Sequence, residues 1–161
     1  MHFNYAIASY YIAHPACLWS DSVKFPVQAD TSDTSPTTGY DALVDQGMLT
    51  RESAEKTKLI IATKQVNIYD LSGKGRSLWT VDVQQPGFGN FCYGHRKVSS
   101  IDSSTPTTAA VGATTEVTYH YTLVDAPAWA TAAETQNAYP QAHPDVSGPQ
   151  AGHTTLTNTS N

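Results

Sequence analysis

The clearest hydrophobic pattern in the chain lies at residues 115–124, where large apolar residues alternate with polar ones. The apolar members share one face of an extended strand and are Val117, Tyr119, Tyr121 and Leu123. Asp125 follows this strand and is a residue type that commonly caps helices. We therefore predict a strand followed by a helix over residues 126–139, which Pro140 ends.

Two short helices are expected earlier in the chain, after a polar loop at residues 30–38. Residues 39–46 have a capping residue before them and Gly47 after them, which is the pattern of a helix that ends at a glycine. Thr50 is a suitable cap for a second helix over residues 51–58. We expect the glycine to form the turn between the two helices.

Further strands are indicated at residues 59–62, 66–71, 78–83 and 97–103 by their β-branched and aromatic composition. The glycine-rich segment 72–76 lies between two of these strands, so we expect it to form a tight basic hairpin turn. A phosphate-binding loop needs the pattern GxxxxGK[ST] at the start of a helix, and this segment does not match it.

These elements predict an α+β fold, with an antiparallel β-sheet, short N-terminal helices and a C-terminal helix. We expect one domain over residues 39–140, an N-terminal segment over residues 1–38 that is tied to it, and a disordered polar tail over residues 141–161. The expected core consists of apolar residues from all the predicted elements: Leu43, Ile60, Val66, Ile68, Leu78, Trp79, Phe91, Val98, Ile101, Val117, Tyr119, Tyr121, Leu123 and Trp129.

The order of helix, helix, strand, turn and strand over residues 39–83 is also that of a winged-helix module. The candidate anion contacts in that arrangement are the basic residues of the second helix and the turn: Arg51, Lys56, Lys58, Lys74 and Arg76. The second helix is short and the isoelectric point is about 5.5, both of which disfavour DNA binding. We therefore expect a winged-helix-like fold that does not bind DNA, and keep a nucleic-acid or anion-binding module using residues 51–97 as the alternative function.

The net charge of −5 conceals a basic middle segment. Residues 51–97 hold eight of the nine Lys and Arg residues but only four of the fourteen Asp and Glu residues. Such a segment either meets an anionic partner or pairs with acids of the same protein, and pairing among exposed residues is the simpler interpretation. The chain has no run of roughly 18 apolar residues, so we expect no membrane span.

The chain has two cysteines, Cys17 and Cys92. Neither has a further cysteine or a histidine at zinc-site spacing, so we expect no structural metal site. In an exported protein the two would form a disulfide that ties the N-terminal segment to the central sheet, whereas in a cytosolic protein both would remain thiols. We favour export to the periplasm or the outer cell surface, with a cytoplasmic location as the alternative.

No residue pattern in the chain points to catalysis or to a cofactor. The six histidines do not occur at metal-ligand spacing, and neither HExxH nor GxSxG is present. His120 lies on the polar face of the 115–124 strand, where an exposed structural position explains it. Cys92 and His95 are expected on opposite faces of one strand, which argues against a nucleophile and its base. We expect a non-enzymatic protein without catalytic residues, cofactor or metal.

Four motifs follow one another along the chain: DALVDQGML at residues 41–49, YDLSGKGR at 69–76, FCYG at 91–94 and VTYHYTLVDAPAWA at 117–130. In this order they resemble a family of small uncharacterised exported proteins of Gram-negative bacteria, many of them lipoproteins. Ser72 and the doubled glycine of the second motif depart from the family pattern. The family has no known activity, so the resemblance implies an exported protein with an interaction or structural role and an unidentified protein partner.

Overall fold

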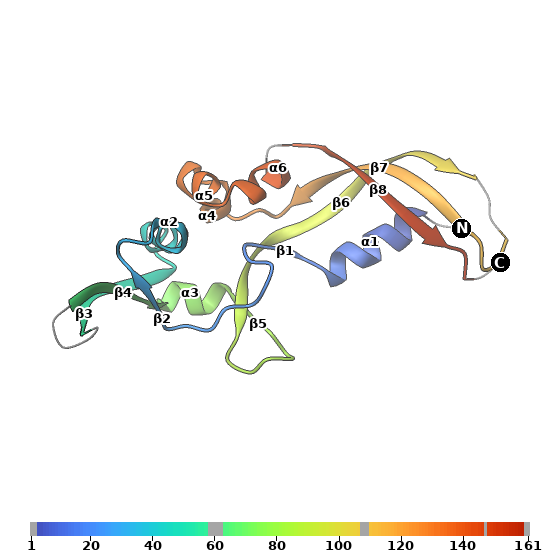
Figure 1. The fold of residues 1–161 in the computed structure, drawn as a ribbon. Helices are drawn as coiled ribbons and strands as arrows, with labels where there is room; N and C mark the ends of the chain where they lie inside the picture. The colour runs from blue at the N-terminus through green and yellow to red at the C-terminus, as the bar shows by residue number, and fades with distance from the viewer. Residues whose placement is uncertain (1–2, 58–62, 107–109, 147, 160–161) are drawn as a thin grey trace. The chain divides into compact units, whose positions relative to one another are not determined.

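The computed structural model of the chain describes residues 3–57, 63–106, 110–146 and 148–159. It confirms the α+β class, with antiparallel sheets and short helices. The chain forms two compact units (Figure 1). Unit 1 comprises residues 1–16, 93–127 and 141–161, and unit 2 comprises residues 17–92 and 128–140. The structure thus divides the chain differently from the single domain expected over residues 39–140.

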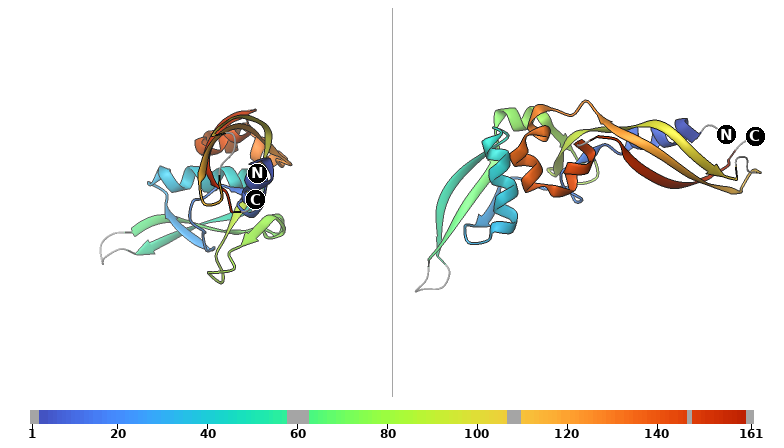
Figure 2. Two further views of the ribbon diagram at one scale, coloured as in Figure 1. Left: turned by 90° about the vertical axis from the view of Figure 1, so that its right-hand side faces the viewer. Right: turned by 90° about the horizontal axis from the view of Figure 1, so that it is seen from above.

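Unit 1 is a curled antiparallel sheet with a helix packed against its inner face (Figures 1 and 2). Its strands are β6 (Gly89–Thr105), of which residues 93–105 belong here, β7 (Thr114–Val124) and β8 (Gln150–Thr157), and β7 lies between the other two. The helix is α1 (Phe3–Ala13), which contributes Ile7 and Tyr11 to a buried cluster with Val117 and Tyr119 of β7. The alternation predicted for residues 115–124 is therefore confirmed for Val117, Tyr119 and Tyr121, whereas residues 121–124 are all partly buried.

The C-terminal segment is ordered against β7, so the expectation of a disordered tail is wrong for its described part. A single 3-10 turn, η1 (Pro140–Ala142), and a helical turn, α6 (His143–Val146), lead into β8. All eight residues of β8 pair with β7 without a register shift. A Cβ on Gly152 would lie 2.5 Å from the ring of Tyr119, so this glycine lets the tyrosine lie flat across the strand.

Unit 2 is built around a three-stranded antiparallel sheet and one longer helix. The strands are β2 (Val27–Asp30), β3 (Leu49–Thr57) and β4 (Thr63–Leu71), with β4 in the middle. The helix is α2 (Thr34–Asp45), which begins earlier than the predicted residue 39 because Asp33 caps it, accepting a hydrogen bond from the Ser35 amide. Leu43 of α2 and Tyr69 of β4 are fully buried.

Two predicted elements of unit 2 are wrong, and the winged-helix-like arrangement fails with them. Of the segment expected to be a helix at 51–58, residues 51–57 lie in the strand β3, which pairs with β4 from Leu49↔Leu71 to Thr57↔Thr63, and residue 58 lies outside the described residues. The segment expected to be a hairpin turn is the short helix α3 (Gly73–Leu78), which Ser72 caps by accepting a 2.9 Å hydrogen bond from the Gly75 amide. The strand expected at 59–62 lies outside the described residues.

The helix expected at 126–139 is two short helices, α4 (Ala128–Thr131) and α5 (Ala133–Ala138), separated by extended backbone at Ala132. Asp125 has a φ of 60°, so it turns the chain in the left-handed region and does not act as the expected cap. The remaining strands are β1 (Ala16–Cys17) and β5 (Trp79–Val81), and β5 pairs with the first residues of β6.

Most of the predicted core is confirmed. The buried members are Leu43, Val66, Phe91, Val98, Val117, Tyr119 and Trp129. The partly buried members are Ile68, Leu78, Trp79, Ile101, Tyr121 and Leu123. Ile60 lies outside the described residues. Trp129 is 5% exposed and its ring lies 6.1 Å from that of Phe91, so it fills the core of unit 2 as expected.

Candidate interaction surfaces

Cys17 and Cys92 form the disulfide that the sequence analysis considered for an exported protein. The bond lies in unit 2 and joins the end of β1 to β6. The backbone pairs beside it, since the amide of Leu18 donates to the carbonyl of Phe91 at 2.9 Å. Neither sulfur is a thiol, so Cys92 cannot serve as a nucleophile beside His95.

Two of the five basic residues proposed as anion contacts, Arg51 and Lys74, are engaged within the protein. Arg51 lies on β3 and forms a 2.8 Å ion pair with Asp41 of α2, which raises the pKa of the guanidinium. Lys74 of α3 donates from Nζ to the carbonyl of Gln46 at 2.9 Å, at the end of α2. This lysine therefore neutralises the negative end of a helix.

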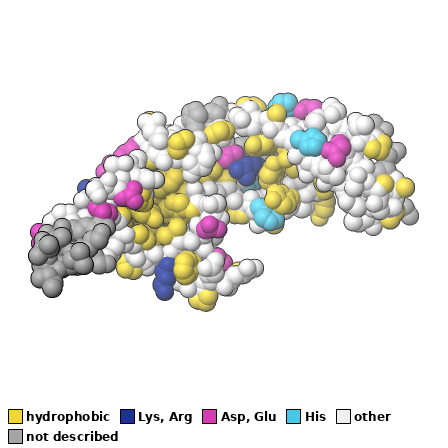
Figure 3. All heavy atoms as spheres, in the orientation of Figure 1, with side chains coloured by type: hydrophobic (Ala, Val, Ile, Leu, Met, Phe, Trp, Pro, Cys, Tyr) yellow, Lys and Arg dark blue, Asp and Glu magenta, His cyan; other side chains and the backbone are white. Residues whose placement is uncertain are grey.

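Of the other three candidates, the structure describes the side chain of Arg76 alone. Arg76 is exposed on α3, Lys56 lies in β3, and Lys58 lies outside the described residues. On the face drawn in Figure 3, the Lys and Arg side chains of unit 2 lie apart from one another. The structure offers no observation in favour of the nucleic-acid alternative among the residues it describes.

Aromatic side chains form the centre of unit 2. Trp19 is the hub, with its ring centroid 5.8 to 6.5 Å from the rings of five others: Phe25, Tyr40, Trp79, Phe91 and Tyr139. All five contacts are edge-to-face or tilted, which is the arrangement that aromatic quadrupoles favour. Hydrophobic side chains of this unit also gather beside α2 at the surface (Figure 3). The cluster serves first as a core, because its rings contact one another on several sides.

The helix α1 of unit 1 is apolar on two sides. Phe3, Ile7 and Tyr11 are spaced four residues apart and face the sheet. Tyr5 and Ile12 are two helical turns apart on another side and are 75% and 72% exposed. A helix that is apolar on its exposed side as well is typical of one that meets a further apolar surface.

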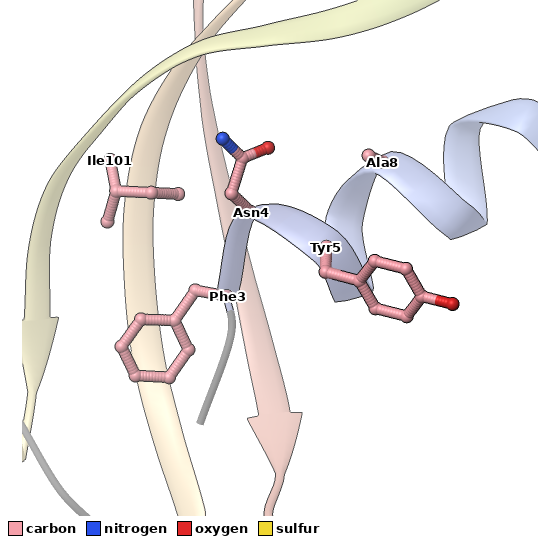
Figure 4. A pocket seen from close by; sticks show the side chains of 5 residues that line it. All are labelled: Phe3, Asn4, Tyr5, Ala8 and Ile101. Atoms are coloured by element: carbon pink, nitrogen blue, oxygen red, sulfur yellow. The ribbon is translucent and has the colours of Figure 1, made fainter.

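A hollow of about 870 Å³ lies next to the exposed part of α1. It is lined by residues from the start of α1 and by one residue of β6: Phe3, Asn4, Tyr5, Ala8 and Ile101. Figure 4 shows the Phe3 ring on the side of Ile101 and the Tyr5 ring directed away from it. The Asn4 amide and the Tyr5 hydroxyl are the two side-chain groups of this lining able to both donate and accept hydrogen bonds, and the remaining lining is apolar, so the hollow suits a mainly apolar group.

A second groove, of about 420 Å³, lies between α1 and β8. Its walls are Ala6, Ile7, Tyr10 and Tyr11 on the helix side and residues 153–156 of β8, with Tyr119 also contributing. The hydroxyls of Tyr11 and Tyr119 share a 2.7 Å hydrogen bond, which fixes the helix to the sheet at this point.

A polar cluster holds the C-terminal segment of unit 1 in place. The Asp145 carboxylate accepts hydrogen bonds from Arg96 Nε at 2.9 Å, from an Arg96 terminal nitrogen at 2.8 Å and from the Tyr93 hydroxyl at 3.0 Å. Burial and the Asp145 charge raise the pKa of Tyr93 well above its ordinary value. The Arg96 guanidinium also lies over the rings of Tyr11 and Tyr121. Because every member has a partner in the fold, this cluster has a structural role.

The outer face of the unit 1 sheet carries two exposed histidine–carboxylate pairs. His120 of β7 contacts Asp102 of β6, and His153 of β8 lies 2.8 Å from Glu116 of β7. His120 thus occupies the exposed structural position that the sequence analysis expected. Within the described residues, no three His, Cys, Asp or Glu side chains are arranged to hold a metal ion.

Sequence reasoning did not identify α1 as a surface element, although the signal was present. Residues 3–13 read FNYAIASYYIA, with one apolar stripe at positions 3, 7 and 11 and another at positions 5 and 12. A second stripe on a short helix is a sign that both sides of the helix meet apolar surface.

The chain was compared with known proteins, and no protein family, curated protein or solved structure matches it. The resemblance to exported Gram-negative proteins therefore rests on its four motifs alone. In the described part of the chain, no helix has both the length and the apolar character needed to cross a membrane.

Proposed function

We propose that this protein is a non-catalytic interaction protein that acts outside the bacterial cytoplasm, in the periplasm or at the cell surface. Its binding surface consists of the exposed side of α1, with Tyr5 and Ile12, and of the hollow beside it. The observation that carries the proposal is the exposure of these two large apolar side chains on one side of α1, of which Tyr5 also lines a hollow of about 870 Å³.

A partner with an apolar surface would gain free energy by covering α1. Burying a large apolar side chain is worth about 1.5–3 kcal/mol, and α1 offers two such side chains on one side. The sheet below holds the helix through Ile7 and Tyr11, so the surface exists before the partner binds and little ordering entropy is lost. The partner is therefore expected to be a protein that presents an apolar side chain to the hollow.

The disulfide supports the location outside the cytoplasm. Disulfides persist in oxidising compartments such as the periplasm and are rare in the cytosol. Cys17 and Cys92 are 75 residues apart, and closing a loop of that length contributes about 4 kcal/mol in the chain-entropy model. A chain kept in a reducing compartment would lose this contribution.

The location is tested by trapping thiols in intact cells of the native host with a membrane-permeant alkylating agent. The mass of the recovered protein then shows how many cysteines were free. We expect no alkylation of Cys17 or Cys92 before reduction, and recovery of the protein in the periplasmic or outer-membrane fraction. Alkylation of both cysteines together with cytosolic fractionation would refute export.

The binding surface is tested by placing a photo-crosslinking amino acid at Tyr5 or Ile12 and, as a control, at Val83, which is also highly exposed but lies in unit 2. We expect illumination of intact cells to join positions 5 and 12 to one and the same polypeptide, identified by mass spectrometry, and position 83 not to yield it. Crosslinks only to lipid, or the same products from all three positions, would contradict the proposal.

A further inference from the structure

We propose that β8 is an interaction edge, and that it pairs antiparallel with β8 of a second copy of this chain about a two-fold axis at Thr154. The interaction would join the two curled sheets into one continuous sheet. The groove beside β8 lies on the opposite side of α1 from the hollow that Ile101 lines. The pairing of β8 is therefore separate from the function proposed above.

The strand β8 is the last strand of its sheet. It pairs with β7 along all eight residues, and no other described strand pairs with its outer side. An edge strand presents a row of unpaired backbone N–H and C=O groups, which another strand can satisfy. The register of β8 has no shift, so this row is uninterrupted over its whole length.

The composition of β8 does not protect it from pairing. Natural edge strands commonly avoid association by carrying charged residues or proline, or by containing bulges. The sequence of β8, QAGHTTLT, contains neither Lys, Arg, Asp, Glu nor proline, and its one titratable residue, His153, already pairs with Glu116. Its three threonines are residues that favour strands.

Beyond its first residues, which pair with β5, the strand β6 borders the same sheet on the side away from β8 and shows the contrast. Along β6, the register with β7 shifts between Val98 and Ser100 and again between Ile101 and Ser103. The same strand also carries the exposed charge of Lys97. Bulges and charge together make the β6 edge a poor template for pairing with another strand. The β6 edge is therefore protected, and the β8 edge is open.

A second copy is the partner that this edge fits. Two identical antiparallel edges meet about a two-fold axis with the same faces aligned when the axis passes through one residue. With Thr154 at the axis, His153 lies opposite Thr155 of the second copy, Ala151 opposite Thr157, and Gly152 opposite Leu156. No like charges face one another in this register, although the chain as a whole carries a net charge of −5.

The groove between α1 and β8 supports the same arrangement. It runs beside Thr154 and Leu156, which lie on the inner face of the edge strand. A strand added to β8 extends that inner wall, and its own Leu156 then lies next to Gly152, the smallest residue of the wall. Pairing of the backbone is thereby combined with burial of apolar surface.

The test measures the mass of the full chain in solution by analytical ultracentrifugation over a series of concentrations. The variant A151K with T157K places lysine opposite lysine at both ends of the proposed pairing. The matched control A151K with T157E places lysine opposite glutamate in the same two positions. Both residues are exposed, so each variant is checked for an unchanged unfolding transition.

We expect the wild-type chain to dimerise, the lysine–lysine variant to dimerise about tenfold more weakly at low salt, and the lysine–glutamate variant to dimerise at least as well as wild type. A wild-type chain that remains monomeric at all concentrations overturns the proposal. A dimer that both variants leave unchanged, or weaken equally, also overturns it, because its contact would then lie elsewhere or in another register.

Discussion

Removal of the Asp145 carboxylate is the most direct test of how the C-terminal segment of unit 1 is held. The side chain of Asp145 is 7% exposed and that of Arg96 is 28% exposed, so the Asp145→Ala variant leaves a mostly buried guanidinium without its carboxylate. It also leaves the buried Tyr93 hydroxyl without its acceptor.

The magnitude follows from these two losses. Breaking a buried ion pair by removing one partner costs about 3–5 kcal/mol, and the partial exposure of Arg96 places this case near the lower limit. The unsatisfied Tyr93 hydroxyl adds about 1 kcal/mol to this cost. The contacts of Arg96 with two tyrosine rings stabilise its unpaired charge and offset a similar amount. We expect the free energy of unfolding to fall by about 3 kcal/mol.

The assay is urea denaturation followed by circular dichroism, with amide hydrogen exchange of peptides from β8 as a local readout. A loss of 3 kcal/mol corresponds to roughly a hundredfold faster exchange where exchange requires the unfolding of this segment. The matched control is Asp102→Ala, which removes the partner of His120 from an exposed pair and should cost less than about 1 kcal/mol.

A double variant separates the ion pair from simple packing. Replacing both Arg96 by Met and Asp145 by Leu removes both charges, and we expect it to be more stable than Asp145→Ala alone. Equal stability of Asp145→Ala and wild type would refute the structural role of the cluster. A double variant less stable than the single one would show that the charges themselves stabilise the fold.

Three further predictions concern the core and the helix start at Ser72. Gly75→Ala should lower the free energy of unfolding, measured by urea denaturation, by about 2–3 kcal/mol, because the new Cβ would overlap the carbonyl of Met48. Gly73→Ala in the same helix, where the space is open, should be neutral or slightly stabilising. Equal effects of the two variants would contradict the packing. Trp129→Ala should cost about 3–5 kcal/mol and shift the urea midpoint accordingly, and a loss below about 1 kcal/mol would mean that the ring is not in the core. In the folded chain, mainly burial raises the pKa of Tyr11, Tyr93 and Tyr139 above the ordinary value of 10.0. The contribution of these tyrosines to stability is therefore fully present below pH 10.0 and is lost as the pH rises beyond it. In an alkaline titration, tyrosinate absorbance should show a late phase that coincides with unfolding, and complete ionisation in a still-folded chain would refute the burial.

The sequence alone determined the elements whose local pattern and tertiary environment agree. In β7 the alternation of apolar and polar residues matches a sheet with one covered face, so both the strand and its buried face could be predicted. The same holds for the burial of Trp129, which is a large apolar residue in a short helical segment. The pairing of Cys17 with Cys92 followed from there being two cysteines, given an oxidising location.

Other elements depended on contacts between residues far apart in the sequence. Residues 51–57 have a helix cap before them and no apolar alternation, yet they form β3 because the backbone of β4 lies beside them. The glycines of segment 72–76 suggest a turn, but Gly75 lies in a helix because only a residue without a side chain fits against the Met48 carbonyl. In both places a tertiary contact overrides the local preference.

The C-terminal segment shows most clearly what could not be predicted from the sequence. Its composition is too polar to predict folding, and composition was the only signal that the sequence offered. Its order comes from eight backbone pairs with β7, from the close fit of Gly152 beneath Tyr119 and from the three hydrogen bonds of Asp145. The sequence therefore determined which segments can be buried, and the tertiary structure decided which polar segments become ordered, because hydrogen bonds and ion pairs stabilise only when their partners lie side by side.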